Sequence, residues 1–402
     1  CATEFVETGR SIFIDSGTTA LRLASMVADE RFTVTTTGPH VAIELAKKGT
    51  GAVNPNPLVG AVIVKDDRII GQGYHARYGD LHAERAAFAS LTEDATGAEM
   101  YVTLEPCCHY GKQPPCTLAI VEHGIKKVYV GSDDPNDKVA GKGIAFLREH
   151  GVEVETGVMK DACDAINPVF FHYITTKLPY VVMKYAMSMD GKIAAYTGKS
   201  QWITGEAARQ HVQETRSWLK GIMVGCNTVL QDDPALTCRI EGGRNPVRIV
   251  CDSHLRIPLD CQLVQTAVDV PTIVATLDGA SDKAKELQRA NVQILQCKEK
   301  DGRIDLYDLM VQLGAQDIDG ILLEGGGTLN EQALAQDIVQ EVQVYIAPKI
   351  IGGAEAKTPV EGKGVPDPNG AYRFAFDRME QVGDDILLRY RKEKREICLQ
   401  ES

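Results

Sequence analysis

One histidine and two cysteines at separate places in the chain, in a pattern typical of metal ligands, constrain its fold more than any other feature. His82 begins a His-Ala-Glu step that ends at Glu84, Cys107 follows a proline, and Cys116 comes after eight further residues. One histidine and two cysteines leave a tetrahedral Zn²⁺ with one open position for water, whose pKa the metal lowers to about 7. The fold must therefore bring three separate segments to one point.

The positions of these residues favour a catalytic site. His82 and Cys116 each begin a predicted helix, where the positive end of the helix favours thiolates. Glu84 then lies beside the metal without binding it. In zinc deaminases a glutamate in this position transfers protons while three other residues hold the metal. The usual spacing between the cysteines is shorter, and Cys108 or His109 as a fourth ligand would make a structural site instead. A structural site has no need of Glu84, so we interpret the cluster as catalytic.

The first half of the chain, from Pro57 to Gly157, alternates short β-like runs with helical ones. This rhythm predicts helices packed on a sheet. The predicted elements are a hairpin of Leu58–Val64 and Ile69–His75, a helix over His82–Leu91, a strand over Met100–Leu104, a helix from Cys116 and a strand over Lys127–Val130.

A second α/β domain is predicted beyond a linker at Lys177-Leu178-Pro179, because proline disfavours helix before it and cannot sit within a central strand. A chain of 402 residues is also too long for one ordinary core. The predicted strands are Tyr180–Ala186, Gly221–Gly225, Val247–Asp252, Thr272–Thr276, Gly320–Glu324 and Val342–Ile346.

Composition excludes several classes of protein. A net charge of -12 argues against a nucleic-acid-binding surface. No apolar run is long enough to cross a membrane, and we expect no secretory signal. Most of the 11 cysteines are scattered, which favours reduced cysteines and a cytoplasmic enzyme over a disulfide framework.

The chain resembles the bifunctional deaminase-reductases of riboflavin synthesis over roughly residues 40 to 392. The resemblance lies in motifs that occur in the family's order. They are Asn54–Gly60, His82–Glu84, Thr103–Cys116, Asp134–Asn136, Val139–Gly143, Met187–Ala194, Ser200–Thr204 and Thr228–Thr237.

The resemblance implies a cytidine-deaminase-like three-layer α/β/α domain over residues 38–178. A dihydrofolate-reductase-like α/β domain is expected over residues 179–402. The first would deaminate a diaminopyrimidinone bearing a ribosylamino 5′-phosphate, with zinc on His82, Cys107 and Cys116 and with Glu84 as proton donor. The second would reduce the ribosyl group of the product to ribityl with NADPH. Such a protein binds no nucleic acid and no membrane, and the family is usually homo-oligomeric.

Other site residues follow from the same resemblance. Asn56 would bind the pyrimidine, although Asn-Pro-Asn-Pro is also a turn sequence. The expected NADPH residues are Ala186, Trp202, Thr228, Asp232, Ser253, Gly326, Gly327 and Thr328. The expected substrate residues of the reductase are Ser200, Arg216, Leu236, Arg239 and Glu324.

Two features of the reductase half can be interpreted from the residues themselves. The run from Ile321 to Leu329 predicts a strand, a glycine loop and a helix, an arrangement that suits a pyrophosphate. Lys184 lies in an apolar run, where a buried charge needs a partner such as Glu324. It is a candidate catalytic group; the alternative is an edge-strand lysine that faces water.

Residues 1–37 do not fit the riboflavin family. Ser11–Leu21 and Thr33–Thr36 resemble the effector domain of the deoxyribonucleoside-repressor family, in which a Ser-Gly-Thr-Thr loop would bind a sugar phosphate. We interpret this segment as an extension, joined within a helix near His40–Lys48 that Gly49 ends. Two alternatives for the whole chain stay open: a deaminase with a degenerate reductase half, and a regulator that senses a sugar phosphate.

Overall fold

The computed structural model describes residues 12–13, 34–35, 38–111 and 113–393. The chain divides into two compact units, Cys1–Thr175 and Thr176–Ser402, and each is described by itself. Two short strands, β1 (Ile12–Phe13) and β2 (Val34–Thr35), pair in parallel. The rest of the repressor-like segment lies outside the described residues.

The first unit is built on a five-stranded sheet in the order β4-β3-β5-β6-β7. Its first three strands pair antiparallel and its last three pair parallel. The strands are β3 (Gly60–Lys65), β4 (Arg68–Tyr74), β5 (Glu99–Leu104), β6 (Lys127–Ser132) and β7 (Glu153–Thr156).

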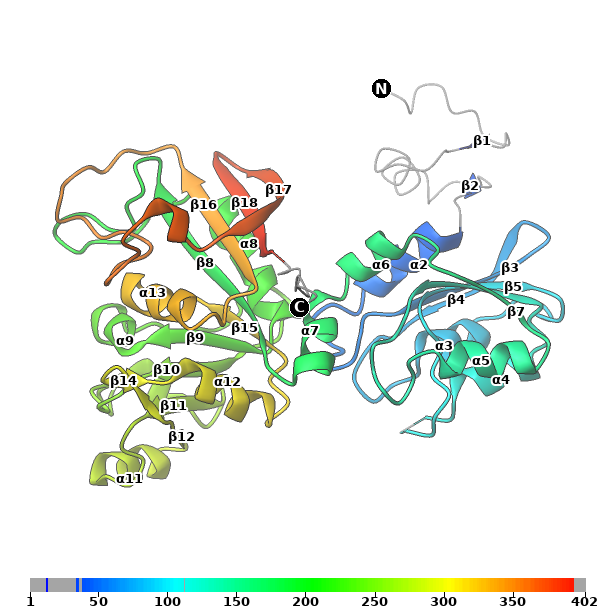
Figure 1. Cartoon of the computed structure of the whole chain (residues 1–402), viewed down its shortest axis with the longest axis horizontal. Coiled ribbons are helices and arrows are strands. Elements are labelled where there is room, and N and C mark those ends of the chain that lie inside the picture. Colours follow the sequence, from blue (N-terminus) through cyan, green and yellow to red (C-terminus); the bar gives the residue numbers. More distant parts are fainter. Residues whose placement is uncertain (1–11, 14–33, 36–37, 112, 394–402) are drawn as a thin grey trace, which may run out of the picture. The chain divides into compact units, whose positions relative to one another are not determined.

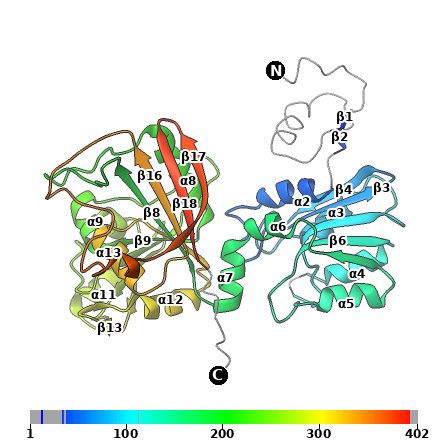
Figure 2. The same cartoon turned by 45° about the horizontal axis from the view of Figure 1, so that its top comes forward.

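Helices cover both faces of this sheet (Figures 1 and 2). Val62 of β3 packs against the helix on one face, whereas Ala61 and Ile63 belong to the core on the other face. A strand buried on both sides needs a continuous apolar run, and β3 has one. One face carries α2 (Gly38–Lys47) and α6 (Lys160–Ala165), and the other carries α3 (Ala83–Ala89), α4 (Cys116–Glu122) and α5 (Lys142–Glu149). The three-layer prediction is confirmed, and α7 (Pro168–Thr176) follows these layers.

The predicted hairpin between β3 and β4 is also present. Asp66 and Asp67 lie at its tip with φ of 49° and 59°. A two-residue hairpin turn of type I′ needs positive φ at both central positions, and aspartate tolerates it better than most residues. The turn therefore sets the register of the two strands.

The second unit contains a nine-stranded sheet in the order β12-β11-β10-β9-β15-β8-β16-β18-β17. Neighbours from β12 to β16 pair in parallel, and β18 and β17 add an antiparallel edge. The strands are β8 (Tyr180–Ser188), β9 (Gly221–Gly225), β10 (Val247–Cys251), β11 (Thr272–Thr276), β12 (Gln293–Gln296), β15 (Gly320–Leu323), β16 (Glu341–Ala347), β17 (Phe374–Val382) and β18 (Asp385–Lys392). The short strands β13 (Glu299–Lys300) and β14 (Arg303–Ile304) form a separate pair.

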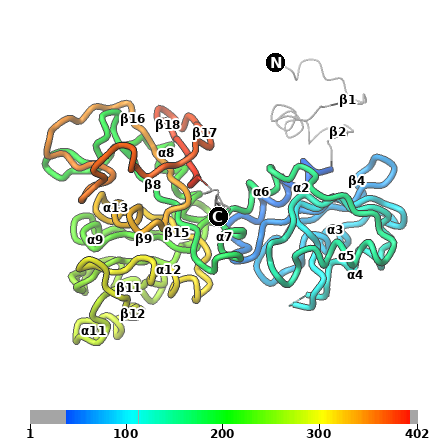
Figure 3. The backbone as a smooth tube through the Cα atoms, in the orientation of Figure 1, coloured from blue at the N-terminus to red at the C-terminus, as the bar shows by residue number. Residues whose placement is uncertain are grey.

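Two hydrophobic cores lie on the two faces of the parallel part, and the path of the chain can be followed in Figure 3. Met223 of β9 joins one core, and its neighbours Ile222 and Val224 join the other. The helices are α8 (Glu206–Trp218), α9 (Cys226–Asp232), α10 (Gln262–Gln265), α11 (Asp282–Arg289), α12 (Leu306–Gly314) and α13 (Gly327–Ala335), with a 3₁₀ turn η2 over Pro368–Gly370. This is the α/β fold predicted for the second domain.

The predicted strands of both halves are present, with bounds within two residues of those observed. The edge-strand alternative for Lys184 is wrong, because β8 lies inside the sheet between β15 and β16. No helix in the described parts of the chain is both long and apolar enough to cross a bilayer.

Gly60 gives a direct test of packing in the first unit. A methyl group added there would lie 2.0 Å from the carbonyl oxygen of Ala42 in α2. We expect Gly60→Ala to lower the free energy of unfolding by about 1–3 kcal/mol, the usual cost of overpacking. Calorimetry should show a lower transition temperature for the first unit.

Tryptophan fluorescence supplies the control for this experiment. The chain has 2 tryptophans, Trp202 and Trp218, and both lie in the second unit. The fluorescence transition should therefore stay in place. Gly111→Ala, which adds a methyl into open space, should leave both transitions unchanged. Equal effects of the two alanines would contradict the packing argument.

Candidate active sites

The three predicted zinc ligands come together at one end of the first unit. His82 caps the N-terminus of α3, Cys116 begins α4, and Cys107 follows the end of β5. Their ligand atoms all lie within 4.8 Å of one another. Among the described residues, no further histidine, cysteine or carboxylate joins this group, so the fourth position is open.

The distances between these atoms suit a tetrahedral metal. The Nδ1 atom of His82 lies 3.5 Å from the Sγ of Cys107 and 3.4 Å from the Sγ of Cys116. Bond lengths of about 2.1 Å to nitrogen and 2.3 Å to sulfur would separate tetrahedral ligands by about 3.6 Å. The residues present therefore fit zinc without a large rearrangement.

The charges of these side chains depend strongly on one another. A hydrogen bond from the Cys116 thiol, followed by one from His82, holds the pKa of Cys107 below its ordinary value. Sharing that proton with Cys107 raises the pKa of Cys116. Burial, and then the charge on Cys107, raises the pKa of the Glu84 carboxyl, which is only 4% exposed. The site thus concentrates anionic groups in a dry environment, where a divalent cation would stabilise them.

The long loop between the cysteines is held at both ends. At its start, the Glu105 carboxylate accepts hydrogen bonds from the backbone N–H groups of Gly141, Gly143 and Ile144 at 2.9–3.2 Å. At its end, Arg85 of α3 donates to the carbonyl oxygens of the two prolines before Cys116 at 3.0 and 3.1 Å. These contacts explain how a loop longer than the usual spacing presents the same ligands.

Asn56 reaches the metal site through a residue that the sequence analysis missed. Its Nδ2 lies 3.1 Å from the Nε2 of His75, whose Nδ1 lies 3.0 Å from the carbonyl oxygen of Leu81. The His75 and His82 rings meet edge to face, 5.6 Å apart. The sequence feature that could have identified His75 is a polar residue at the end of a predicted strand, shortly before His82.

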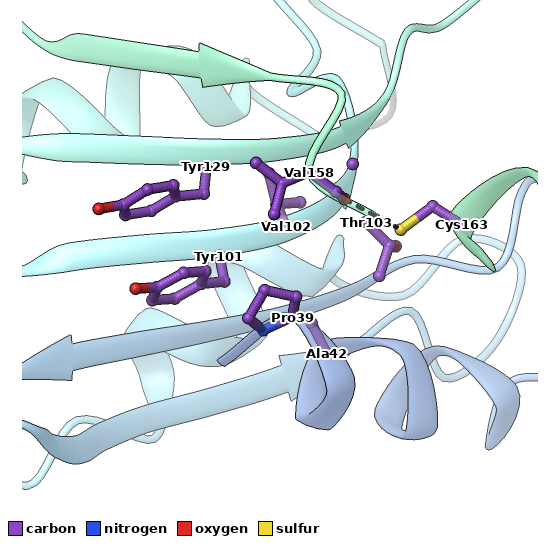
Figure 4. Close-up of a pocket in the computed structure, with 9 residues that line it drawn as sticks. Pro39, Ala42, Tyr101, Val102, Thr103, Tyr129, Val158 and Cys163 are labelled. Carbon is purple, nitrogen blue, oxygen red and sulfur yellow. Dashed lines mark hydrogen bonds between the residues drawn. The ribbon is translucent and has the colours of Figure 1, made fainter. Parts of the chain in front are cut away.

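A small cavity in the same unit is not the active site. It has a volume of about 10 Å³, enough for one water, and lies beside α2 and the stacked rings of Tyr101 and Tyr129 (Figure 4). Two of the zinc ligands, His82 and Cys116, stand at the starts of α3 and α4, which cover the opposite face of the sheet. The cavity therefore has no part in metal binding.

The second unit brings four of its predicted site residues together. Glu324 lies directly after β15. The guanidinium of Arg216, on α8, donates to both of its carboxylate oxygens, at 3.0 and 2.9 Å. Burial alone would raise the pKa of Glu324, but Arg216 and then Lys184 outweigh it and hold the pKa at about 2. Arg239 adds a weaker effect in the same direction. Three cationic side chains therefore surround one carboxylate.

Lys184 differs from the prediction in its partner. In the described parts of the chain it makes no ion pair, because Glu324 pairs with Arg216 instead. Burial lowers the pKa of Lys184, and the Glu324 charge only partly offsets this effect. A lysine with a lowered pKa can lose a proton more easily than an exposed one, which suits proton transfer.

The other predicted residues lie where parallel strands end. Ala186 is near the end of β8, Thr228 and Asp232 are on the helix after β9, and Ser253 follows β10. Exposed Trp202 stacks on Arg209, with 4.6 Å between the guanidinium and the ring centroid. Among the described residues, no hydrogen bond or ion pair joins Ser200 or Trp202 to the Glu324 cluster.

The glycine loop after β15 opens α13 as predicted, with Gly326 as its N-cap. Gly326 faces open space, whereas a methyl on Gly327 would lie 2.8 Å from the carbonyl oxygen of Thr358. Gly327 is therefore small because another segment packs against it. Thr328 is exposed in the first turn of the helix.

Comparisons with known proteins agree with both sites. The family model for the cytidine and deoxycytidylate deaminase zinc-binding region matches residues 34–132, and the model for the RibD C-terminal domain matches residues 179–388. The chain is 54% identical to riboflavin biosynthesis protein RibD of Actinobacillus pleuropneumoniae over 87% of this chain and 93% of that protein. It is 39% identical to the RibD of Escherichia coli over 86% of this chain and 96% of that protein.

Solved structures show the same architecture. One is a diaminohydroxyphosphoribosylaminopyrimidine deaminase/5-amino-6-(5-phosphoribosylamino)uracil reductase from Thermotoga maritima, with a TM-score of 0.80 and 38% identity over 89% of this chain and 98% of that chain. The chain therefore belongs to the RibD family of riboflavin biosynthesis proteins, and it is a bifunctional enzyme that joins a zinc-dependent deaminase to an NADPH-dependent reductase.

Proposed function

We propose that residues 38–178 deaminate 2,5-diamino-6-(5-phosphoribosylamino)pyrimidin-4(3H)-one by hydrolysis and that residues 179–402 reduce the ribosyl group of the product to ribityl. The observation that carries the first half is the meeting of His82, Cys107 and Cys116 beside the buried Glu84. The name of the Thermotoga relative supports the choice of substrates.

In the deaminase, His82, Cys107 and Cys116 would hold zinc, which when bound lowers the pKa of a water to about 7. Glu84 would take a proton from the attacking water and deliver protons to the pyrimidine and to the departing ammonia. Its burial supports this role, because a buried carboxyl whose pKa is raised holds a proton more readily than an exposed one and can pass it on. Asn56 would hold the pyrimidine, with His75 behind it.

In the reductase, the nicotinamide supplies the hydride and the chain positions the two reactants. We assign NADPH to Ala186, Trp202, Thr228, Asp232, Ser253 and the loop Gly326–Thr328. The proposed substrate residues are Ser200, Arg216, Leu236, Arg239 and Glu324, with Lys184 as the proton-transfer group.

The structure suggests different tasks for the two arginines. Three donors of Arg216 are already used, two on Glu324 and one on the carbonyl oxygen of Thr237 at 3.0 Å. Arg239 is exposed and makes no ion pair among the described residues. We therefore assign the 5′-phosphate chiefly to Arg239, whose guanidinium can hold two phosphate oxygens.

The Glu84→Gln variant tests the deaminase. It keeps the shape of the side chain but removes the group that moves protons, so we expect deamination to fall by about 10²–10⁴-fold. Products are identified by mass after incubation with the diaminopyrimidinone ribosyl phosphate. NADPH-dependent gain of two hydrogens on supplied deaminated compound should continue at the normal rate. Retained deamination, with zinc bound, would show that Glu84 is not the proton shuttle.

The Arg239→Ala variant tests the reductase. Loss of a charged phosphate contact should raise the KM for the deaminated substrate by about 10- to 100-fold. The KM for NADPH and the deaminase rate should not change. Arg303→Ala, which removes an exposed arginine from β14 of the same unit, serves as the control. An unchanged substrate KM in Arg239→Ala would refute the assignment.

We also propose that the enzyme is a homo-oligomer. The antiparallel edge of the second unit exposes apolar side chains on one face, with Phe376 and Met379 62% and 63% exposed on β17 and Ile386 42% exposed on β18. An edge strand with such side chains is prone to associate with another copy. The cytoplasmic location expected from the sequence stays a prediction.

Light scattering with size-exclusion chromatography tests the assembly. We expect the full chain to elute as a dimer or larger species and the Phe376→Glu, Met379→Glu double variant to elute as a monomer. Val268→Glu introduces a charge at a valine that is 72% exposed elsewhere in the unit, and it should not change the assembly. A double variant that keeps the size of the wild type would place the interface on another surface.

A further inference from the structure

Arg248, on β10 of the reductase unit, is among the largest fully buried side chains of the described residues, at 0% exposure. Taking a guanidinium out of water is costly unless every N–H finds an acceptor. Within the described parts of the chain, Arg248 forms no ion pair with a carboxylate. Burial lowers the pKa of this arginine. Burial of the Arg248 guanidinium therefore requires acceptors elsewhere in the fold.

All five N–H donors of Arg248 are satisfied, and every acceptor is neutral. One acceptor belongs to the first residue of β11, and the other four lie on segments that precede or follow neighbouring strands. They are Thr272 Oγ1 (2.9 Å) for Nε, Thr266 Oγ1 (2.8 Å) and the Ala235 carbonyl (3.3 Å) for Nη1, and the carbonyls of Leu263 (3.0 Å) and Val270 (2.8 Å) for Nη2.

Two of these contacts lead to the same turn, which spans Asp233 to Leu236. One is direct, through the Ala235 carbonyl. The other passes through α10: Arg248 holds the carbonyl of Leu263, and the neighbouring Gln262 donates its backbone N–H to the Asp233 carboxylate at 2.7 Å and its side chain to the Asp233 carbonyl. Arg248 thus supports both ends of the turn.

The turn needs such support because its backbone is strained. Asp233 and Leu236 have φ of 37° and 51°, in the left-handed region that residues with a Cβ avoid. Such conformations persist only where the surroundings over-determine them. A leucine has no side-chain oxygen that could stabilise this conformation locally. Leu236 is held instead by the burial of its side chain in the core and by the hydrogen bonds that fix its neighbours Asp233 and Ala235.

The turn ends at the proposed substrate residue Leu236, and the segment after it contains the second one, Arg239. This segment is held on its other side by α8, where Gln213 accepts from the Arg239 backbone N–H at 3.0 Å and Arg216 donates to the Thr237 carbonyl. The segment is therefore fixed between α8 and the Arg248 network. A change in the turn would displace both substrate residues.

We propose that Arg248 is a positioning residue of the reductase: it holds the turn Asp233–Leu236 in the conformation that places Leu236 and Arg239 against the substrate. This inference rests on the proposed function of those two residues. Arg248 itself touches neither substrate nor cofactor.

Arg248→Lys in the full chain tests the proposal, because lysine keeps the charge but cannot reach acceptors on both sides. We expect the KM for the deaminated substrate to rise by about tenfold, since a small misplacement of a site from a distance costs up to about 100-fold. The KM for NADPH and the deaminase rate should stay within about twofold of the wild type.

A matched control separates positioning from stability. Leu309→Ala truncates a fully buried leucine of α12 in the hydrophobic core on the other face of the sheet, which contains no residue of the turn. It should lower the tryptophan-fluorescence transition temperature and leave the substrate KM unchanged. An Arg248→Lys variant that behaves like Leu309→Ala, or that raises both KM values equally, overturns the proposal.

Gln262→Ala provides a second test if Arg248→Lys does not fold, because Gln262 is exposed. It should raise the substrate KM by about threefold through loss of the contacts with Asp233, and an unchanged KM would count against the proposal. Arg239→Ala is measured alongside. If its KM is normal while that of Arg248→Lys is raised, Arg239 is not a substrate residue but the positioning role stands.

Discussion

The first unit depends on one meeting point, where the end of β5 approaches the N-termini of α3 and α4. Two zinc ligands stand at helix starts, where the backbone favours thiolates, and the third leaves the strand between them. The sheet must be buried on both faces to place these helices, which accounts for the apolar run in β3. The long loop between the cysteines is compatible with this geometry only because Glu105 and Arg85 fix its two ends.

The second unit also brings side chains from separate segments to one point, through an ion pair rather than through metal ligands. Its proposed site residues follow the ends of parallel strands, where loops from distant parts of the sequence gather at one edge of a sheet. Glu324 leaves β15 and is held by Arg216 from α8, while Lys184 comes from the adjacent strand β8. Here the ion pair between Arg216 and Glu324 fixes the orientation of the site residues, as the shared metal does for its ligands in the first unit.

Much of this could be predicted from the sequence, for identifiable reasons. The predicted strands of the parallel region are largely apolar runs, so their bounds were close to those observed, whereas the short polar strand β12 was not predicted. The strands β17 and β18 were not anticipated, because most side chains of β17 face solvent and its sequence mixes charges with exposed Phe376 and Met379. No period-two pattern marks such an edge.

Contacts between side chains were harder to foresee. Lys184 was expected to pair with Glu324, but the planar guanidinium of Arg216 matches both carboxylate oxygens and takes that place. His75 and Arg248 were missed because a histidine at a strand end and an arginine within a strand are unremarkable in sequence. Their importance comes from acceptors supplied by segments far along the chain, such as Leu81 and Val270.

The two sites carry an excess of opposite charge: the deaminase site gathers anionic groups, and the reductase site gathers cationic ones. In the deaminase, two thiols and a buried carboxyl compete for few protons, so the site is completed by a cation. In the reductase, Arg216, Lys184 and Arg239 face the single carboxylate of Glu324, so an excess of positive charge remains for an anionic ligand. A chain with a net charge of -12 can therefore bind a sugar phosphate, because the positive charge is concentrated where the phosphate is proposed to bind. Arg216 tolerates burial because it pairs with Glu324, and Arg239 stays exposed, so Lys184 is the partly buried cation of the three that makes no ion pair among the described residues.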